Sequence, residues 1–96
     1  MNREQLISKM TDIALKTIKH YFTDFTAYDI PRITKVEQPV TYTWSVRDSG
    51  TWMFEYENGK QSRYVELIRS QYEGDPSYKE YTITYDGTEW KIEEGE

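Results

Sequence analysis

Residues 40–57 read VTYTWSVRDSGTWMFEYE, and most of this run alternates between apolar and polar side chains. Alternation with a period of two is typical of strands that bury one face. Asp48, Ser49 and Gly50 interrupt it and fit a three-residue hairpin loop with the glycine in the left-handed position. This loop predicts three pairs on one face: Val46 opposite Trp52, Trp44 opposite Phe54, and Tyr42 opposite Tyr56.

Turn signals divide the rest of this half of the chain into further strands. Asn58-Gly59 is a strong type I′ hairpin signal, residues 73–77 contain glycine and proline, and Asp86-Gly87 marks another turn. The sequence therefore predicts five antiparallel strands, including strands over 36–47, 60–72, 78–85 and 88–93. In this register the core face carries Val65 and Leu67, Ile83 opposite Trp90, and Tyr81 opposite Ile92.

The N-terminal residues 1–28 have the pattern of one amphipathic helix. Apolar residues recur every three or four positions from Leu6 to Phe25, and Asn2 and Gln5 have the spacing of a capping box. Ile30 precedes a proline, which favours extended backbone at this position, so the helix is expected to end before it.

These elements predict one α+β domain over residues 1–96, with an N-terminal helix packed on a five-stranded antiparallel β-meander. The sheet spans 36–93, and the acidic tail 94–96 is expected to be disordered. In architecture alone, this arrangement resembles cystatin-like and related α+β folds.

The core must be built largely from aromatic rings. Leu, Ile, Val and Phe number only 18 of 96 residues, whereas aromatic residues make up 16% of the chain. Each ring can bury roughly 150–250 Å². The chain has no cysteine, which excludes thiolate catalysis, iron–sulfur clusters and the usual structural zinc sites. No signal-peptide pattern or long apolar run is present, so we expect a cytoplasmic protein of a bacterium or a phage-infected cell.

Charge is distributed unevenly along the chain. Residues 1–35 contain six basic and four acidic side chains, whereas residues 36–96 contain six basic and thirteen acidic ones. An acidic sheet half repels nucleic acid phosphates and anionic lipid. We therefore expect a protein partner with a basic surface, and no direct binding to nucleic acid or to a membrane.

Motifs for catalysis, metals and cofactors are missing from the sequence. His20 is the sole histidine and is predicted on the helix, with no nucleophile motif elsewhere. The acidic residues lack EF-hand spacing, and four of the five glycines occupy turns rather than a phosphate-binding loop. The sequence thus predicts a non-enzymatic protein with no catalytic residue, no bound metal and no cofactor.

The outward face of the predicted sheet carries the candidate partner-binding residues. Met53, Tyr64 and Ile68 form an apolar island on it, ringed by glutamates, and the turn after residue 72 is acidic. An apolar centre with a charged rim is typical of protein-binding surfaces. The predicted partner-binding set is Met53, Glu55, Glu57, Tyr64, Glu66, Ile68, Tyr72, Glu73, Asp75 and Glu80.

The leading hypothesis is an inhibitor that masks a basic, nucleic-acid-handling enzyme. In size, acidity and lack of cofactors the chain resembles bacterial immunity proteins against nuclease toxins and phage counter-defence proteins of the anti-CRISPR or anti-restriction type. One alternative is a cystatin-like protein binding a small ligand between helix and sheet. That cavity would be lined by Tyr21, Tyr42, Trp44, Tyr56 and Trp90. The other alternative is a structural role, with a homodimer formed through an edge strand or the outer sheet face.

Overall fold

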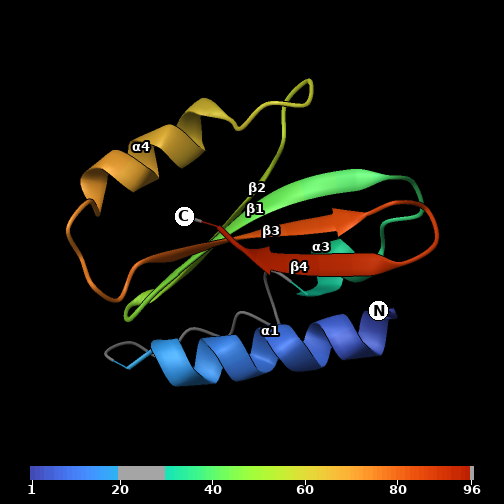
Figure 1. Cartoon of the computed structure of the whole chain (residues 1–96), viewed down its shortest axis with the longest axis horizontal. Coiled ribbons are helices and arrows are strands. Elements are labelled where there is room, and N and C mark those ends of the chain that lie inside the picture. The colour runs from blue at the N-terminus through green and yellow to red at the C-terminus, as the bar shows by residue number, and fades with distance from the viewer. Residues whose placement is uncertain (20–29, 96) are drawn as a thin grey trace.

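The computed structural model describes residues 1–19 and 30–95, which form an antiparallel sheet in the order β2-β1-β3-β4 with helices on both faces (Figure 1). Helix α1 contributes three buried side chains to one face of the sheet. Helix α4 contacts side chains on the opposite face. The elements are α1 (Arg3–Thr17), α3 (Ile30–Thr34), β1 (Val40–Arg47), β2 (Gly50–Glu55), α4 (Arg63–Gln71), β3 (Lys79–Tyr85) and β4 (Trp90–Glu94).

The α+β class and the antiparallel sheet are confirmed, but the predicted strand over 60–72 is wrong. The type I′ turn does form: Asn58 and Gly59 have φ of 51° and 76°, and Glu57 pairs with Lys60. After Lys60 the chain leaves the sheet and forms α4, whose N-cap Ser62 accepts a hydrogen bond from the Val65 N–H. The sheet therefore has four strands, and α4 replaces the fifth.

The register between β1 and β2 differs by one residue from the predicted one. Gly50 pairs with Arg47, so the loop contains only Asp48 and Ser49. Trp44 consequently lies opposite Met53, and Ser45 lies opposite Trp52. Because side chains alternate between faces, a one-residue shift moves every side chain of the strand to the other face. Met53 joins the core, while the aromatic rings of β2 face α4.

The hydrophobic core lies between α1 and the sheet. Leu6, Met10 and Ala14 lie at helical spacing on the buried side of α1. The predicted capping box of Asn2 and Gln5 begins this helix and is confirmed. Large buried residues dominate the sheet side of the core, which explains how a chain with few aliphatic residues folds. These sheet residues are Tyr42, Trp44, Val46, Met53, Tyr81, Ile83, Trp90 and Ile92.

Helix α1 is shorter than the helix predicted over 1–28. It ends at Thr17, and the next residue, Ile18, has extended backbone with ψ of 119°. The Lys19 N–H then donates to the Asp48 carbonyl at 2.9 Å, which ties the end of α1 to the β1–β2 turn. β-Branched residues at the helix end have low helix propensity, consistent with this early stop. The apolar stripe beyond Lys19 and the single His20 lie outside the described residues.

Strands β3 and β4 pair in a register two residues away from the predicted one. Ile83 lies opposite Ile92, and Tyr85 lies opposite Trp90. The turn contains four residues because the Asp86 carboxylate accepts hydrogen bonds from the Thr88 and Glu89 N–H groups. A two-residue shift keeps each side chain on its face, so the predicted core residues of this hairpin remain in the core. Glu94 belongs to β4, and the Gly95 N–H donates to the Glu80 carbonyl.

Candidate partner-binding site

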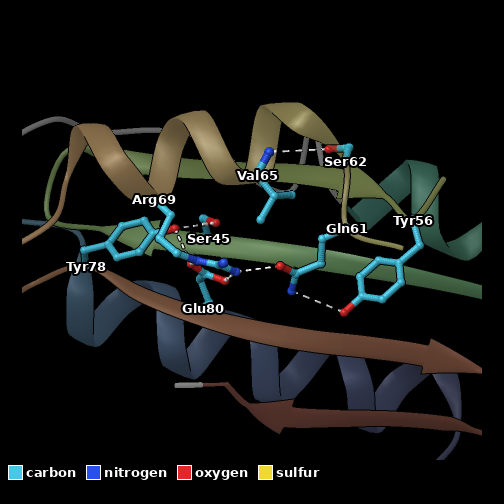
Figure 2. A network of polar contacts seen from close by, with 8 residues as sticks. All are labelled: Ser45, Tyr56, Gln61, Ser62, Val65, Arg69, Tyr78 and Glu80. Atoms are coloured by element: carbon cyan, nitrogen blue, oxygen red, sulfur yellow. Dashed lines mark hydrogen bonds and ion pairs between the residues drawn. The ribbon is translucent and has the colours of Figure 1, made fainter. Parts of the chain in front are cut away.

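The layer between α4 and the sheet is polar, unlike the core beneath α1. Val65 is the fully buried residue of α4, and it lies above strand residues with hydroxyl and carboxylate side chains. Thr43 and Ser45 of β1 and Glu80 of β3 are all buried on this side of the sheet. Figure 2 shows the side chains that connect Ser45 and Glu80 to α4. Burying polar groups of this kind costs free energy unless hydrogen bonds compensate for the water that they lose.

Arg69 and Glu80 form the centre of this polar layer. Arg69 Nε and Nη2 donate to the two carboxylate oxygens of Glu80 at 2.8 Å each, a bidentate geometry (Figure 2). Glu80 is only 6% exposed. The Tyr78 hydroxyl donates to Glu80 Oε2 at 2.7 Å and lies 3.2 Å from Ser45 Oγ. Arg69 Nη2 also donates a hydrogen bond to Gln61 Oε1 at 2.6 Å.

The pKa shifts follow from this network. Burial pushes the pKa of Glu80 upward, but hydrogen bonds from Arg69 and Tyr78 and the charge of Arg69 outweigh it and hold this pKa below its ordinary value. Burial, together with the bond to the Glu80 carboxylate and its charge, raises the pKa of Tyr78 to about 12. At neutral pH Glu80 is therefore ionised, and Tyr78 keeps the proton that it donates.

A pocket of about 630 Å³ opens beside this network, between α4, the following turn and β3. Five members of the predicted partner-binding set line it together. Four of its side chains are carboxylates, of which Glu80 is paired with Arg69 and Asp75 with Arg47. Glu66 and Glu73 are exposed, and neither is paired with a cation within residues 1–19 and 30–95. The lining residues are Glu66, Arg69, Ser70, Tyr72, Glu73, Gly74, Asp75, Tyr78 and Glu80.

Tyr72, which lines one end of this pocket, contacts two aromatic rings and an arginine. Tyr72 stacks on Trp52 with ring centroids 5.3 Å apart and lies 6.1 Å from the Tyr78 ring. The Arg47 guanidinium lies 4.3 Å from the Tyr72 ring centroid and pairs with Asp75 at 2.9 Å. Hydrogen bonds from Ser77 and from Arg47 hold the pKa of Asp75 below its ordinary value. Trp, Tyr and Arg are the residues enriched at the energetic centres of protein interfaces.

The remaining predicted residues lie on the other side of α4 or in the core. Glu55, Glu57 and Tyr64 line a smaller pocket of about 280 Å³, where Tyr64 stacks on Phe54 at 6.0 Å. Tyr64 is 63% exposed.

The prediction that Met53, Tyr64 and Ile68 form an exposed apolar island is wrong. Met53 is 5% exposed and packs in the core, because the β1–β2 register turns it toward α1. Ile68 is half-buried on α4, and the exposed apolar neighbour of Tyr64 is Leu67, which is 59% exposed. Leu67 therefore does not face the core, as the strand prediction required.

Sequence reasoning missed Arg69 and Tyr78, which organise the pocket. Both were overlooked because residues 60–72 were interpreted as a strand. A signal was present: Val65, Ile68, Arg69 and Tyr72 have the i, i+3, i+4, i+7 spacing of one helix face, with Ser62 as a suitable N-cap. That pattern predicts a helix whose inner face carries an arginine in need of a carboxylate partner.

The residues expected to line a ligand cavity are divided between the two faces. Tyr42, Trp44 and Trp90 are buried in the core against α1. Tyr56 lies on the α4 side, where its hydroxyl accepts a hydrogen bond from Gln61 Nε2 at 3.4 Å. Tyr21 lies outside the described residues. In the described part of the chain, no group of three or more His, Asp or Glu side chains is placed to hold a metal ion.

Comparison with known proteins gives no match: no family model, no curated protein and no solved structure is similar to this chain. Among the described helices, none combines the length and the apolar character needed to cross a membrane.

Proposed function

We propose that this chain is a small, acidic, non-enzymatic binding protein that masks a basic protein partner, with the 630 Å³ pocket as its contact site. The observation that carries the proposal is the pairing pattern in that pocket. Arg69 and Arg47 neutralise Glu80 and Asp75, whereas Glu66 and Glu73 are exposed at its rim and form no ion pair with any residue of 1–19 or 30–95. A lysine or arginine from a partner would complete the pairing.

The surroundings of the pocket favour a protein partner over a nucleic acid. The carboxylates at the rim repel phosphates, and the chain as a whole carries a formal net charge of −5. The half-buried rings of Trp52 and Tyr72 provide rigid apolar contact area beside the charged rim. An apolar centre next to charged residues is a common arrangement of protein interfaces.

We further propose that the partner is an enzyme that handles nucleic acid. Such enzymes carry clustered lysines and arginines that bind phosphates, and carboxylates held at fixed positions can occupy the same sites. This mode of action is the one expected of an immunity protein or of a phage inhibitor of the anti-CRISPR or anti-restriction type. Binding would be fast and salt-sensitive, because long-range attraction accelerates the encounter.

Charge reversal at the rim provides the test. In Glu66→Lys/Glu73→Lys, the association rate with a nucleic-acid-handling enzyme that binds the wild-type chain is expected to fall by about tenfold or more at low salt. The difference should shrink as salt is added. Association rates would be measured by stopped-flow or surface plasmon resonance over a series of salt concentrations.

Glu93→Lys/Glu94→Lys is the matched control, because it changes the net charge equally at exposed positions of β4. It should slow association much less than the pocket variant does. An equal fall of the association rate in both variants would show that only net charge matters, and the pocket would no longer be part of the proposal. An association rate that does not depend on salt would remove the electrostatic mechanism.

A further inference from the structure

The two faces of the sheet hold their helices by different forces. Beneath α1, Leu6, Met10 and Ala14 pack into the continuous apolar core. Beneath α4, Val65 is the one fully buried apolar residue of the helix and Ile68 is half-buried, and hydrogen bonds, an ion pair and partly exposed rings add to the contact. Because apolar burial is the dominant stabilising force in folding, the two helices differ in how firmly they are held.

We infer that α4 and its flanking turns form a conformational unit that opens while α1 and the sheet stay folded, and that the Arg69–Glu80 ion pair is its latch. This inference goes beyond the proposed function and does not depend on it. Units that open separately are characteristic of regions with few buried apolar contacts.

The placement of the latch explains why it controls α4. Arg69 lies on α4 and Glu80 on β3, so their two hydrogen bonds join the helix directly to the sheet (Figure 2). Gln61, in the segment that leads into α4, is held by the same arginine. Breaking this one pair therefore removes the charged contact between α4 and β3 and the anchor of the arginine that also holds Gln61.

The groups that face Glu80 determine how the latch responds to pH. Arg69 faces it from α4, Tyr78 from the position just before β3, and Ser45 of β1 contacts the Tyr78 hydroxyl. Tyr56, after β2, is close enough for the Glu80 charge to raise its pKa, although hydrogen bonds lower that pKa overall. Glu66, Glu73 and Asp75 are the other acidic side chains that line the same pocket.

Acid is expected to release the latch. The pKa of Glu80 is lowered in the folded chain, so the stabilisation it gives is present above its unfolded-state pKa and is lost as the pH falls through the folded-state value. Opening also removes one wall of the 630 Å³ pocket, because α4 supplies Glu66, Arg69 and Ser70 to it. The pocket thus exists only while α4 is closed.

Amide hydrogen exchange measured by NMR on the full chain tests the inference, with rates corrected for intrinsic exchange. In the wild-type chain at pH 7, amides of α4 should have opening constants at least about tenfold larger than those of β1 and β3. Between pH 7 and pH 3 the opening constants of α4 should rise more than those of β1 and β3. Equal opening constants in α4, β1 and β3 at both pH values would overturn the inference.

Glu80→Gln keeps the shape of the side chain and removes its charge. At pH 7 it should raise the opening constants of α4 by about tenfold or more. Between pH 7 and pH 3, the amount by which the rise in α4 exceeds the rise in β1 and β3 should fall to half of the wild-type value or less. Glu93→Gln is the control, an exposed glutamate of β4 that should leave α4 unchanged. An unchanged response of α4 to acid in Glu80→Gln would show that Glu80 is not the latch.

Arg69→Met is expected to reverse the pH response of the α4 opening constants. It leaves the buried Glu80 carboxylate without its cation, so burial should now raise the pKa of Glu80. The opening constants of α4 should therefore fall as the pH is lowered from 7 toward 5, the reverse of the wild-type response. A response in the wild-type direction would contradict the assigned role of the ion pair.

Discussion

Trp44→Ala is expected to lower the free energy of unfolding by about 3–5 kcal/mol. Trp44 is fully buried at the centre of β1, between Met53 on one neighbouring strand and Tyr81 on the other. Its ring lies 5.6 Å from the Tyr81 ring, in a tilted arrangement. Truncation removes this contact and leaves a cavity that the β-sheet cannot close without moving its strands.

Urea denaturation followed by circular dichroism would measure this loss. A domain of this size has a total stability of about 5–15 kcal/mol, so the loss removes about a fifth of it or more. Leu15→Ala is the control, since Leu15 is 72% exposed on α1 and its truncation should change stability by about 0.5 kcal/mol or less. Similar losses in the two variants would contradict a core centred on Trp44.

Met53→Asp is expected to destabilise the fold by about 3 kcal/mol or more. Met53 is almost fully buried and lies opposite Trp44, so an aspartate there places a carboxylate in the apolar core. The core cluster to which it belongs consists of apolar and aromatic side chains. Thermal and urea unfolding would both report the loss.

Phe54→Asp makes this prediction a test of register. Phe54 is only partly buried and faces α4, where it stacks on the exposed ring of Tyr64. Replacing Phe54 by aspartate should lower the free energy of unfolding less than replacing Met53 does, because water can reach the new carboxylate. The register predicted from the sequence places Phe54 in the core and Met53 outside. A larger loss for Phe54→Asp would therefore contradict the structure and support that earlier register.

Turn chemistry and periodicity were enough to predict the elements that depend on local sequence. The capping box of α1, the Asn58-Gly59 turn and the core face of the β3–β4 hairpin all follow from short-range patterns. Strand pairing in the last hairpin was predicted two residues away from the observed register. The shift does not change the faces, because side chains on a strand alternate with a period of two.

The β1–β2 register could not be settled by local sequence. Asp48-Ser49-Gly50 fits a loop of three residues, and it equally allows a two-residue loop in which Gly50 pairs with Arg47. The two loops differ by one residue, and that residue decides which side chains of β2 enter the core. The choice depends on tertiary packing: Met53 fits beside Trp44 against α1, while the rings of β2 meet α4.

Residues 60–72 combine a hairpin turn with a helix, and this misled the prediction. A type I′ turn normally leads into a paired strand, and here it forms a single bridge before Ser62 caps α4. For this reason, the residues of the candidate site were predicted only in part. Glu66, Tyr72 and Glu73 were among the predicted residues, but Arg69 was missed because the helical spacing that brings it to Glu80 was interpreted as a strand.

The most direct test of the proposed function is an NMR titration of the ¹⁵N-labelled chain with a hexa-arginine peptide at low salt. The peptide stands in for the basic surface of a partner. We predict chemical-shift changes concentrated around the 630 Å³ pocket, at Glu66, Tyr72 and Glu73, that disappear in Glu66→Lys/Glu73→Lys and persist in Glu93→Lys/Glu94→Lys. Shift changes spread evenly over the acidic residues, or concentrated on β4, would contradict the assignment of this pocket as the partner-binding site.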